Sequence, residues 1–199
     1  MKEFLLKNNN LKIVEELSKS IPEAKAEIEF KFWNELKEEI GGSIGEYGFS
    51  LDNDQGVSEV NKIKNARNNK WSPLEMYYVY EDYFNENVLS IGVANAKADE
   101  DFYLFFQIFD KDVQEVGLKN IEEELLKKLT TLSLKTSSGA TNLYKYCDTD
   151  FQYENKNFYK LQDEGKRKEV IKKIKDGLLE IAVHIDENRS EIGKILKGI

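Results

Sequence analysis

Side chains suited to chemistry are scarce in this chain. It has one histidine, His184, one cysteine, Cys147, and no glycine-rich loop with the spacing of a phosphate-binding motif. His184 lies about 100° from Ile185 on a predicted helix and has no second histidine at helical spacing, which indicates a boundary residue without a metal pair. Cys147 has no histidine near it in sequence and is interpreted as a small apolar residue, while a nucleophile assembled through space stays open. We therefore expect no catalytic residues, no cofactor and no metal site.

Two polar segments match ligand loops only in part. The run Asp52-Asn-Asp-Gln-Gly56 begins like a calcium loop, but glycine is its fifth residue and Ile63 stands where the twelfth should be acidic. Ser137, Ser138 and Gly139 could hold an anion if a helix followed, but the residues after 142 lack the pattern of a helix start. Both segments are therefore interpreted as turns or breaks between elements.

Aromatic side chains are abundant, with 10 Tyr, 11 Phe and 2 Trp, and many lie between residues 71 and 109. Base-stacking platforms place lysine or arginine between the aromatics, whereas the aromatics at 77–84 are flanked by acids that would repel phosphate. Strand alternation puts Tyr78 and Tyr80 on one face and Tyr77 and Val79 on the other. Tyrosines beside carboxylates suit recognition of a basic protein surface. The predicted partner-binding residues are Tyr78, Tyr80, Glu81, Asp82, Tyr83 and Glu86.

Composition limits the size and the compartment. The 199 residues fit a single domain, and the 40% hydrophobic content can form a core. A net charge of -8 and a pI near 5.0 argue against a general polyanion binder. No apolar run approaches the roughly 20 residues of a membrane span, and the N-terminus lacks the apolar region of a signal peptide. We expect a cytoplasmic protein that contacts neither nucleic acid directly nor membranes.

The first 40 residues predict a helical arm made of two helices. Leu11, Val14 and Leu17 form a short amphipathic stripe, and the chain is expected to break at residues 20–22. Ser20 would cap the second helix with Pro22 in its first turn, and residues 41–42, both glycine, would end it.

The middle of the chain, residues 45–153, predicts a sheet with one helix. Alternation indicates a strand at 47–51, and further strands are expected at 74–80, 88–94 and 102–109, the last apolar on both faces. A helix is predicted at 118–132 and an edge strand within 142–153. A loop at 52–70 would hold one helical turn near 60–66. The short polar links at 81–87 and 95–101 join antiparallel neighbours.

A long helix at residues 163–197, bent near Gly177 or Asn188, should close the fold. The expected architecture is α+β, an antiparallel meander of three to five strands packed with helices from both ends of the chain. The residues predicted to be buried together are Phe32, Leu36, Leu104, Phe106, Ile174 and Leu178.

Two segments resemble a known family. The run Phe32-Trp-Asn-Glu-Leu36 and the run Asn157-Phe-Tyr-Lys-Leu161 before the last helix are similar to the C-terminal part of PD-(D/E)xK-nuclease-like bacterial proteins. That family needs an acid opening one strand and an acid-x-lysine triplet on the next. Here Glu23-Ala-Lys25 and Glu29-Phe-Lys31 lie on a predicted helix, and Glu154-Asn-Lys156 lies in a polar turn. The resemblance therefore implies an accessory portion without the nuclease core.

The leading hypothesis is a non-catalytic accessory domain that binds a protein with a basic surface, linked to a nuclease or a defence system. A second hypothesis is a small acidic inhibitor from a phage or mobile element that blocks a nucleic-acid-binding site. A third is an unrecognised PD-(D/E)xK-like nuclease.

Overall fold

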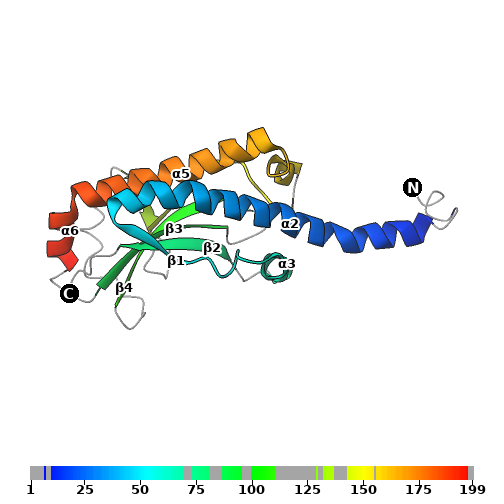
Figure 1. Cartoon of the computed structure of the whole chain (residues 1–199), viewed down its shortest axis with the longest axis horizontal. Coiled ribbons are helices and arrows are strands. Elements are labelled where there is room, and N and C mark those ends of the chain that lie inside the picture. The colour runs from blue at the N-terminus through cyan, green and yellow to red at the C-terminus, as the bar shows by residue number, and fades with distance from the viewer. Residues whose placement is uncertain are drawn as a thin grey trace.

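Two long helices lie side by side over one face of an antiparallel sheet, and the first of them continues beyond the sheet as an arm (Figure 1). This α+β architecture confirms the class predicted from sequence. The computed structural model describes residues 7, 10–69, 73–80, 87–95, 100–110, 129, 132–136, 143–154 and 156–196.

The elements follow one another as helices, a meander and helices again. The helical elements are α2 (Asn10–Ile44), η1 (Gly45–Tyr47), α3 (Val60–Asn68), η4 (Lys156–Lys160), α5 (Glu164–Glu187) and α6 (Arg189–Leu196). The strands are β1 (Phe49–Asn53), β2 (Leu74–Tyr80), β3 (Asn87–Asn95), β4 (Tyr103–Asp110), β5 (Lys135–Thr136) and β6 (Leu143–Tyr146).

The described strands form one sheet in the order β1-β2-β3-β4-β6-β5, with every pair antiparallel. Strand β4 lies between β3 and β6, an interior position in the sheet of the kind expected for a strand that is apolar on both faces. The strand register places Phe106 opposite Ile91 and Leu143, and Leu104 opposite Val93, so these side chains share one face of the sheet.

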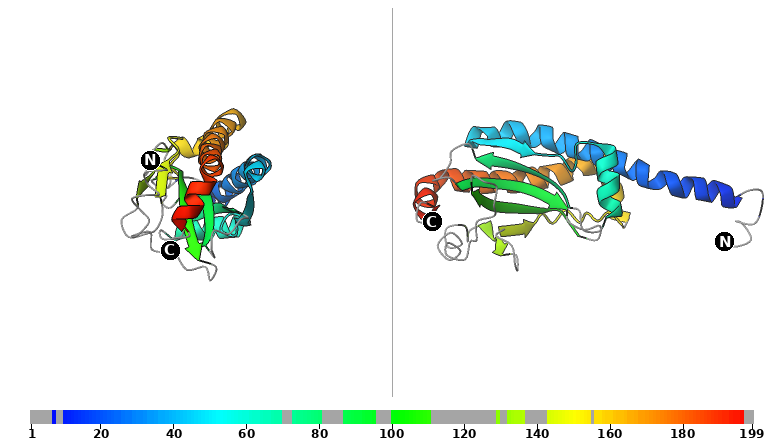
Figure 2. Two further views of the ribbon diagram at one scale, coloured as in Figure 1. Left: turned by 90° about the vertical axis from the view of Figure 1, so that its left-hand side faces the viewer. Right: turned by 90° about the horizontal axis from the view of Figure 1, so that it is seen from below.

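The core lies between that face and the helices α2 and α5, and the end-on view in Figure 2 shows both helices on the same side of the sheet. All six residues predicted to be buried together have exposed fractions of 0–1%, which confirms the prediction. Gly177 of α5 marks the closest approach, because a Cβ there would lie 2.5 Å from Cδ1 of Leu104.

The predicted break at residues 20–22 is wrong, because α2 runs without interruption through Pro22. Ser20 does not cap a second helix, because it lies inside α2, where its hydroxyl donates a hydrogen bond to the Glu16 carbonyl. Packing of the C-terminal half of α2 on the core outweighs the backbone hydrogen bond that proline removes. The glycines at 41–42 also lie within the helix, and Gly48, at φ +78°, follows η1 instead.

Several other elements have bounds that differ from the predicted ones. The turn expected near 60–66 is the full helix α3, and the first strand begins at Phe49 because residues 45–47 form η1. The strand within 142–153 is β6, which is not at the edge because β5 pairs with it. The last helix divides at Asn188 and not at Gly177. The helix predicted at 118–132 falls mainly outside the described residues.

Candidate functional site

The two tyrosines predicted to meet a partner face the core. Strand β2 alternates buried and half-buried residues, and Tyr78 and Tyr80 are 1% and 4% exposed. Burial raises the pKa of the Tyr78 phenol well above its usual range. The expectation that these two rings are presented to a partner is therefore wrong, because the sheet turns this face toward the helices. The other predicted contacts, Glu81, Asp82, Tyr83 and Glu86, lie outside the described residues.

The opposite face of the sheet carries an aromatic cluster, made of Tyr77, Tyr103, Phe105, Tyr144 and Tyr146. Ring centroids in this aromatic sheet face lie 5.9–6.5 Å apart, as in Tyr144–Tyr146 and Tyr77–Phe105. Phe105 lies over Gly92, where a Cβ would be 2.4 Å from the ring. Burial raises the pKa of Tyr103 to about 12, and Tyr146 is 42% exposed. Phe105 is buried, Tyr77, Tyr103 and Tyr144 are half-buried, and Tyr146 is the most exposed ring of the cluster.

The lone histidine and the lone cysteine of the chain both lie in half-buried positions. His184 is half-buried near the last turn of α5, and Cys147 is half-buried after β6. Burial raises the pKa of the Cys147 thiol, which is the opposite of what activates a nucleophile. Within the described residues, no three or more His, Cys, Asp or Glu side chains group closely enough to hold a metal ion.

A buried ion pair holds the middle of α2, and little in the sequence indicates it. Glu29 is fully buried and accepts two hydrogen bonds from the Arg67 guanidinium of α3, one of them 2.9 Å long to Nε. Arg67 Nη1 also donates to Oδ1 of Asn95 at 2.6 Å, and that amide donates to the Glu100 carbonyl. The only sequence signal was a carboxylate at core spacing between Ala26 and Trp33. Glu29 thus serves the fold, bound by a cation from a distant segment.

One turn earlier, Lys25 fixes the point where α2 leaves the body. Its ammonium donates to the Tyr153 carbonyl at 2.8 Å and lies over the rings of Tyr153 and Phe158 at 4.4 and 4.6 Å. Burial lowers the pKa of Lys25. With the Glu29–Arg67 pair, this contact anchors the base of the arm to α3 and to the segment before α5.

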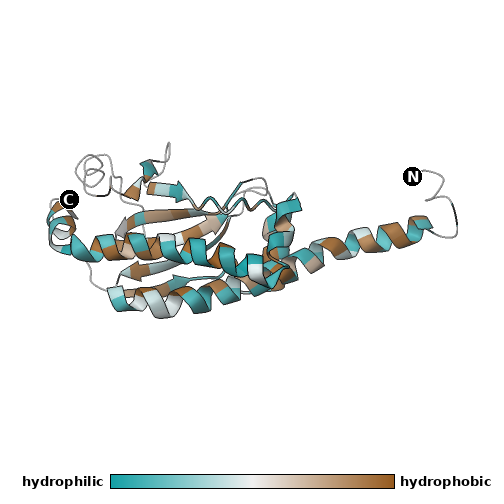
Figure 3. Ribbon diagram, turned by 90° about the horizontal axis from the view of Figure 1, so that it is seen from above, coloured by the Kyte–Doolittle hydropathy of each residue, from teal (hydrophilic) through white to brown (hydrophobic). Residues whose placement is uncertain are grey.

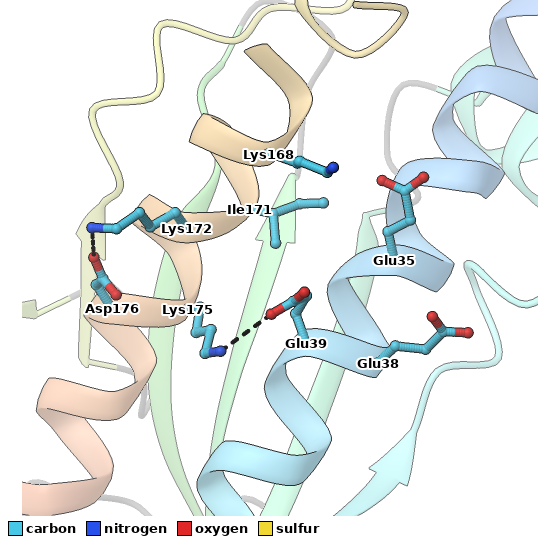
Figure 4. Close-up of a pocket in the computed structure, with 8 residues that line it drawn as sticks. All are labelled: Glu35, Glu38, Glu39, Lys168, Ile171, Lys172, Lys175 and Asp176. Carbon is cyan, nitrogen blue, oxygen red and sulfur yellow. Dashed lines mark hydrogen bonds and ion pairs between the residues drawn. The ribbon is translucent and has the colours of Figure 1, made fainter. Parts of the chain in front are cut away.

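Between α2 and α5 the surface forms a shallow groove with a volume of about 430 Å³ (Figure 4). Lys175 pairs with Glu39 across the groove at 3.2 Å, and Lys172 pairs with Asp176 along α5 at 2.9 Å. Beneath it, the buried Arg167 guanidinium contacts both Glu35 carboxylate oxygens, at 2.7 and 3.0 Å. These ion pairs connect the two helices across the groove and neutralise most of the charge that lines it.

The arm of α2 carries apolar side chains that none of the other described elements covers. Figure 3 shows hydrophobic residues recurring along it beyond the end of the sheet. The exposed apolar side chains of the arm are Leu11 (49%), Ile13 (50%), Val14 (40%), Leu17 (58%) and Ile21 (54%). Isolated apolar side chains are ordinary on protein surfaces, whereas a contiguous row on a projecting helix leaves apolar area available for contact.

Helical geometry collects four of these residues into one face. At about 100° per residue, Ile13, Val14, Leu17 and Ile21 span roughly 100° of the helix circumference, and we call this face the arm stripe. The opposite face is charged and carries Lys12, Glu15, Glu16 and Lys19. The sequence had indicated an amphipathic stripe here, but its exposure follows only from the tertiary structure.

The arm stripe can bury aliphatic area against a second helix, which is what an amphipathic helix outside a core requires. None of the described helices combines the length and apolar content that a membrane crossing needs. Comparison of the chain with family models, with curated proteins and with solved structures gave no match, so the arm stripe stands on its own geometry.

Proposed function

We propose that this chain acts by binding another protein, and that the arm of α2 is the element that binds. Protein binding was expected from the sequence, and we place the contact on the arm instead of on the residues predicted at 78–86. The observation that carries it is the row of four aliphatic side chains, 40–58% exposed, on a helix whose base is anchored by buried contacts.

Burial of this row would contribute substantially to binding. Full burial of an aliphatic side chain is worth about 1.5–3 kcal/mol, and each stripe residue has roughly half of its surface left to bury. The anchored base lowers the conformational entropy lost on association, because the helix is already continuous with a packed segment.

A membrane surface is the rival occupant for any amphipathic helix. Helices that lie on membranes carry lysine and arginine on the polar face. Here Lys12 and Lys19 are matched by Glu15 and Glu16 on that face, and the whole chain has a net charge of -8. A protein partner is therefore favoured over an anionic lipid surface.

The test is site-specific photo-crosslinking in cells that produce the protein. A photoreactive amino acid is placed either at Leu17, within the arm stripe, or at Lys19 on the opposite face as the matched control. We expect a discrete protein adduct from position 17 and none from position 19. Equal labelling from both positions, or no adduct from position 17, would refute the proposal.

A further inference from the structure

We propose that the partner of the arm stripe is the arm stripe of a second copy of this chain, running antiparallel, so that two arms join two bodies into a dimer. This inference rests on the proposed function and names its partner. Three observations support it, namely the position at which α5 begins, the spacing of the apolar residues in the arm, and the charge of the residues beside them.

The start of α5 determines which orientation fits. Glu35 and Glu39 lie on the same side of α2 as the arm stripe, and they pair with Arg167 and Lys175 of α5. Helix α5 therefore already covers this side of α2 along the body, and it begins only at Glu164. A helix bound to the arm stripe must lie on the same side of α2 as α5, beyond the first turn of α5 (Figure 1).

This position of the partner helix excludes a parallel pair of arms. In a parallel dimer both bodies would lie at the same end, and both α5 helices would compete for the space between the two α2 helices. In an antiparallel dimer each body lies beyond the tip of the other arm. Each partner arm then occupies the free side of α2 and stops where α5 starts.

The spacing of the stripe is self-complementary in this orientation. Val14, Leu17, Ile21 and Ala24 recur at intervals of three, four and three residues, the spacing of a two-helix seam. The row is symmetric about position 19. An antiparallel copy therefore places Leu17 against Ile21 of the partner subunit, and Val14 against the small Ala24 of the partner subunit.

The residues near position 19 also have charges that are compatible with a twofold axis there. An isologous interface brings residues beside the axis close to their own copies, so a charged residue there would repel itself. The residues flanking the stripe beside the axis are Ser18 and Ser20, which are uncharged. Lys12, Glu16 and Lys19 point away from the seam.

The first experiment measures molar mass by sedimentation equilibrium of the full chain over a range of concentrations. We expect a species of twice the 23.1 kDa chain mass. The double variant Leu17→Ser/Ile21→Ser should raise the dissociation constant at least about tenfold, because each truncation removes apolar area from both halves of the seam. The control Glu15→Ser/Lys19→Ser alters two exposed residues on the opposite face, leaves net charge unchanged and should dimerise as the wild type does.

The second experiment tests orientation by disulfide formation in a Cys147→Ser background. A mixture of the Val14→Cys chain and the Ala24→Cys chain should cross-link under mild oxidation, whereas Val14→Cys alone should not. Self-cross-linking of Val14→Cys alone would overturn the antiparallel arrangement. A wild type that stays monomeric, or a dimer that persists in Leu17→Ser/Ile21→Ser, would overturn pairing through the arms.

These outcomes separate the inference from the function on which it rests. If the wild type is monomeric while the photo-crosslink at position 17 captures a different protein, the second copy is wrong and protein binding through the arm survives. If position 17 captures nothing, both fail. An adduct of twice the chain mass supports both.

Discussion

The two halves of α2 belong to one helix and differ in what surrounds them. From Ala26 to Ile44 the large apolar side chains that face the sheet are fully buried, and a buried glutamate is bound by an arginine from α3. From Leu11 to Ile21 the apolar side chains are about half exposed. The row in the arm lies roughly 130° around the helix from the row that faces the sheet, so the arm does not simply extend the core. One half of the helix stabilises this chain, and the other presents apolar surface outward.

The largest expected effect is the difference between one truncation in each half. Phe32→Ala should lower the free energy of unfolding by about 3–5 kcal/mol, because Phe32 contacts Trp33 and Phe102 in the core. Leu17→Ala should lower it by less than about 1 kcal/mol when measured below the concentration at which chains associate. Urea unfolding of both variants checks this. Equal losses would mean that the arm is packed within the monomer.

The anchor of the arm gives the next largest effect. Arg67→Ala leaves the Glu29 carboxylate buried without its cation and should cost about 3–5 kcal/mol. Lys12→Ala breaks the exposed Lys12–Glu16 pair, whose atoms lie 3.8 Å apart, and should change stability by less than about 0.5 kcal/mol. The measurement is thermal and urea unfolding. The double change Glu29→Leu/Arg67→Met should recover much of the loss, and failure to do so would assign the cost to packing alone.

A local effect is expected from the proline within the arm. Pro22→Ala supplies the missing backbone N–H and should stabilise this turn by up to about 3 kcal/mol. Hydrogen exchange of the backbone amides at 18–26 should slow, while the midpoint of global unfolding changes little. A large change in global unfolding would show that the arm and the body unfold as one unit.

The smallest effect concerns pH and the sheet. Burial raises the pKa of Glu75 in β2, so ionising this carboxyl opposes folding. The folded state holds this proton more tightly than the unfolded state, and stability falls as pH rises from the unfolded pKa through the folded one. Glu75→Gln should therefore raise Tm slightly near about pH 7 and leave it unchanged near about pH 4. A gain at the lower pH would point to hydrogen bonding as the cause.

The sequence by itself determined the class of the fold and the core. The pattern of apolar residues and short polar links located β2 at its observed bounds and β3 and β4 within one residue. Period-3.6 spacing located Phe32, Leu36, Ile174 and Leu178 on faces that the structure buries. These features are local, so neighbouring residues suffice to predict them.

Tertiary structure alone decided which faces meet. Sequence could separate Tyr78 and Tyr80 from Tyr77, but the side that the helices cover depends on where α2 and α5 pack. The Glu29–Arg67 pair joins residues 38 positions apart, beyond the reach of any local pattern. The arm stripe is exposed for the same reason, since α5 begins only at Glu164 and leaves that side of α2 uncovered. Exposure depends on what lies opposite a residue in space, and spacing along the chain carries no information about that.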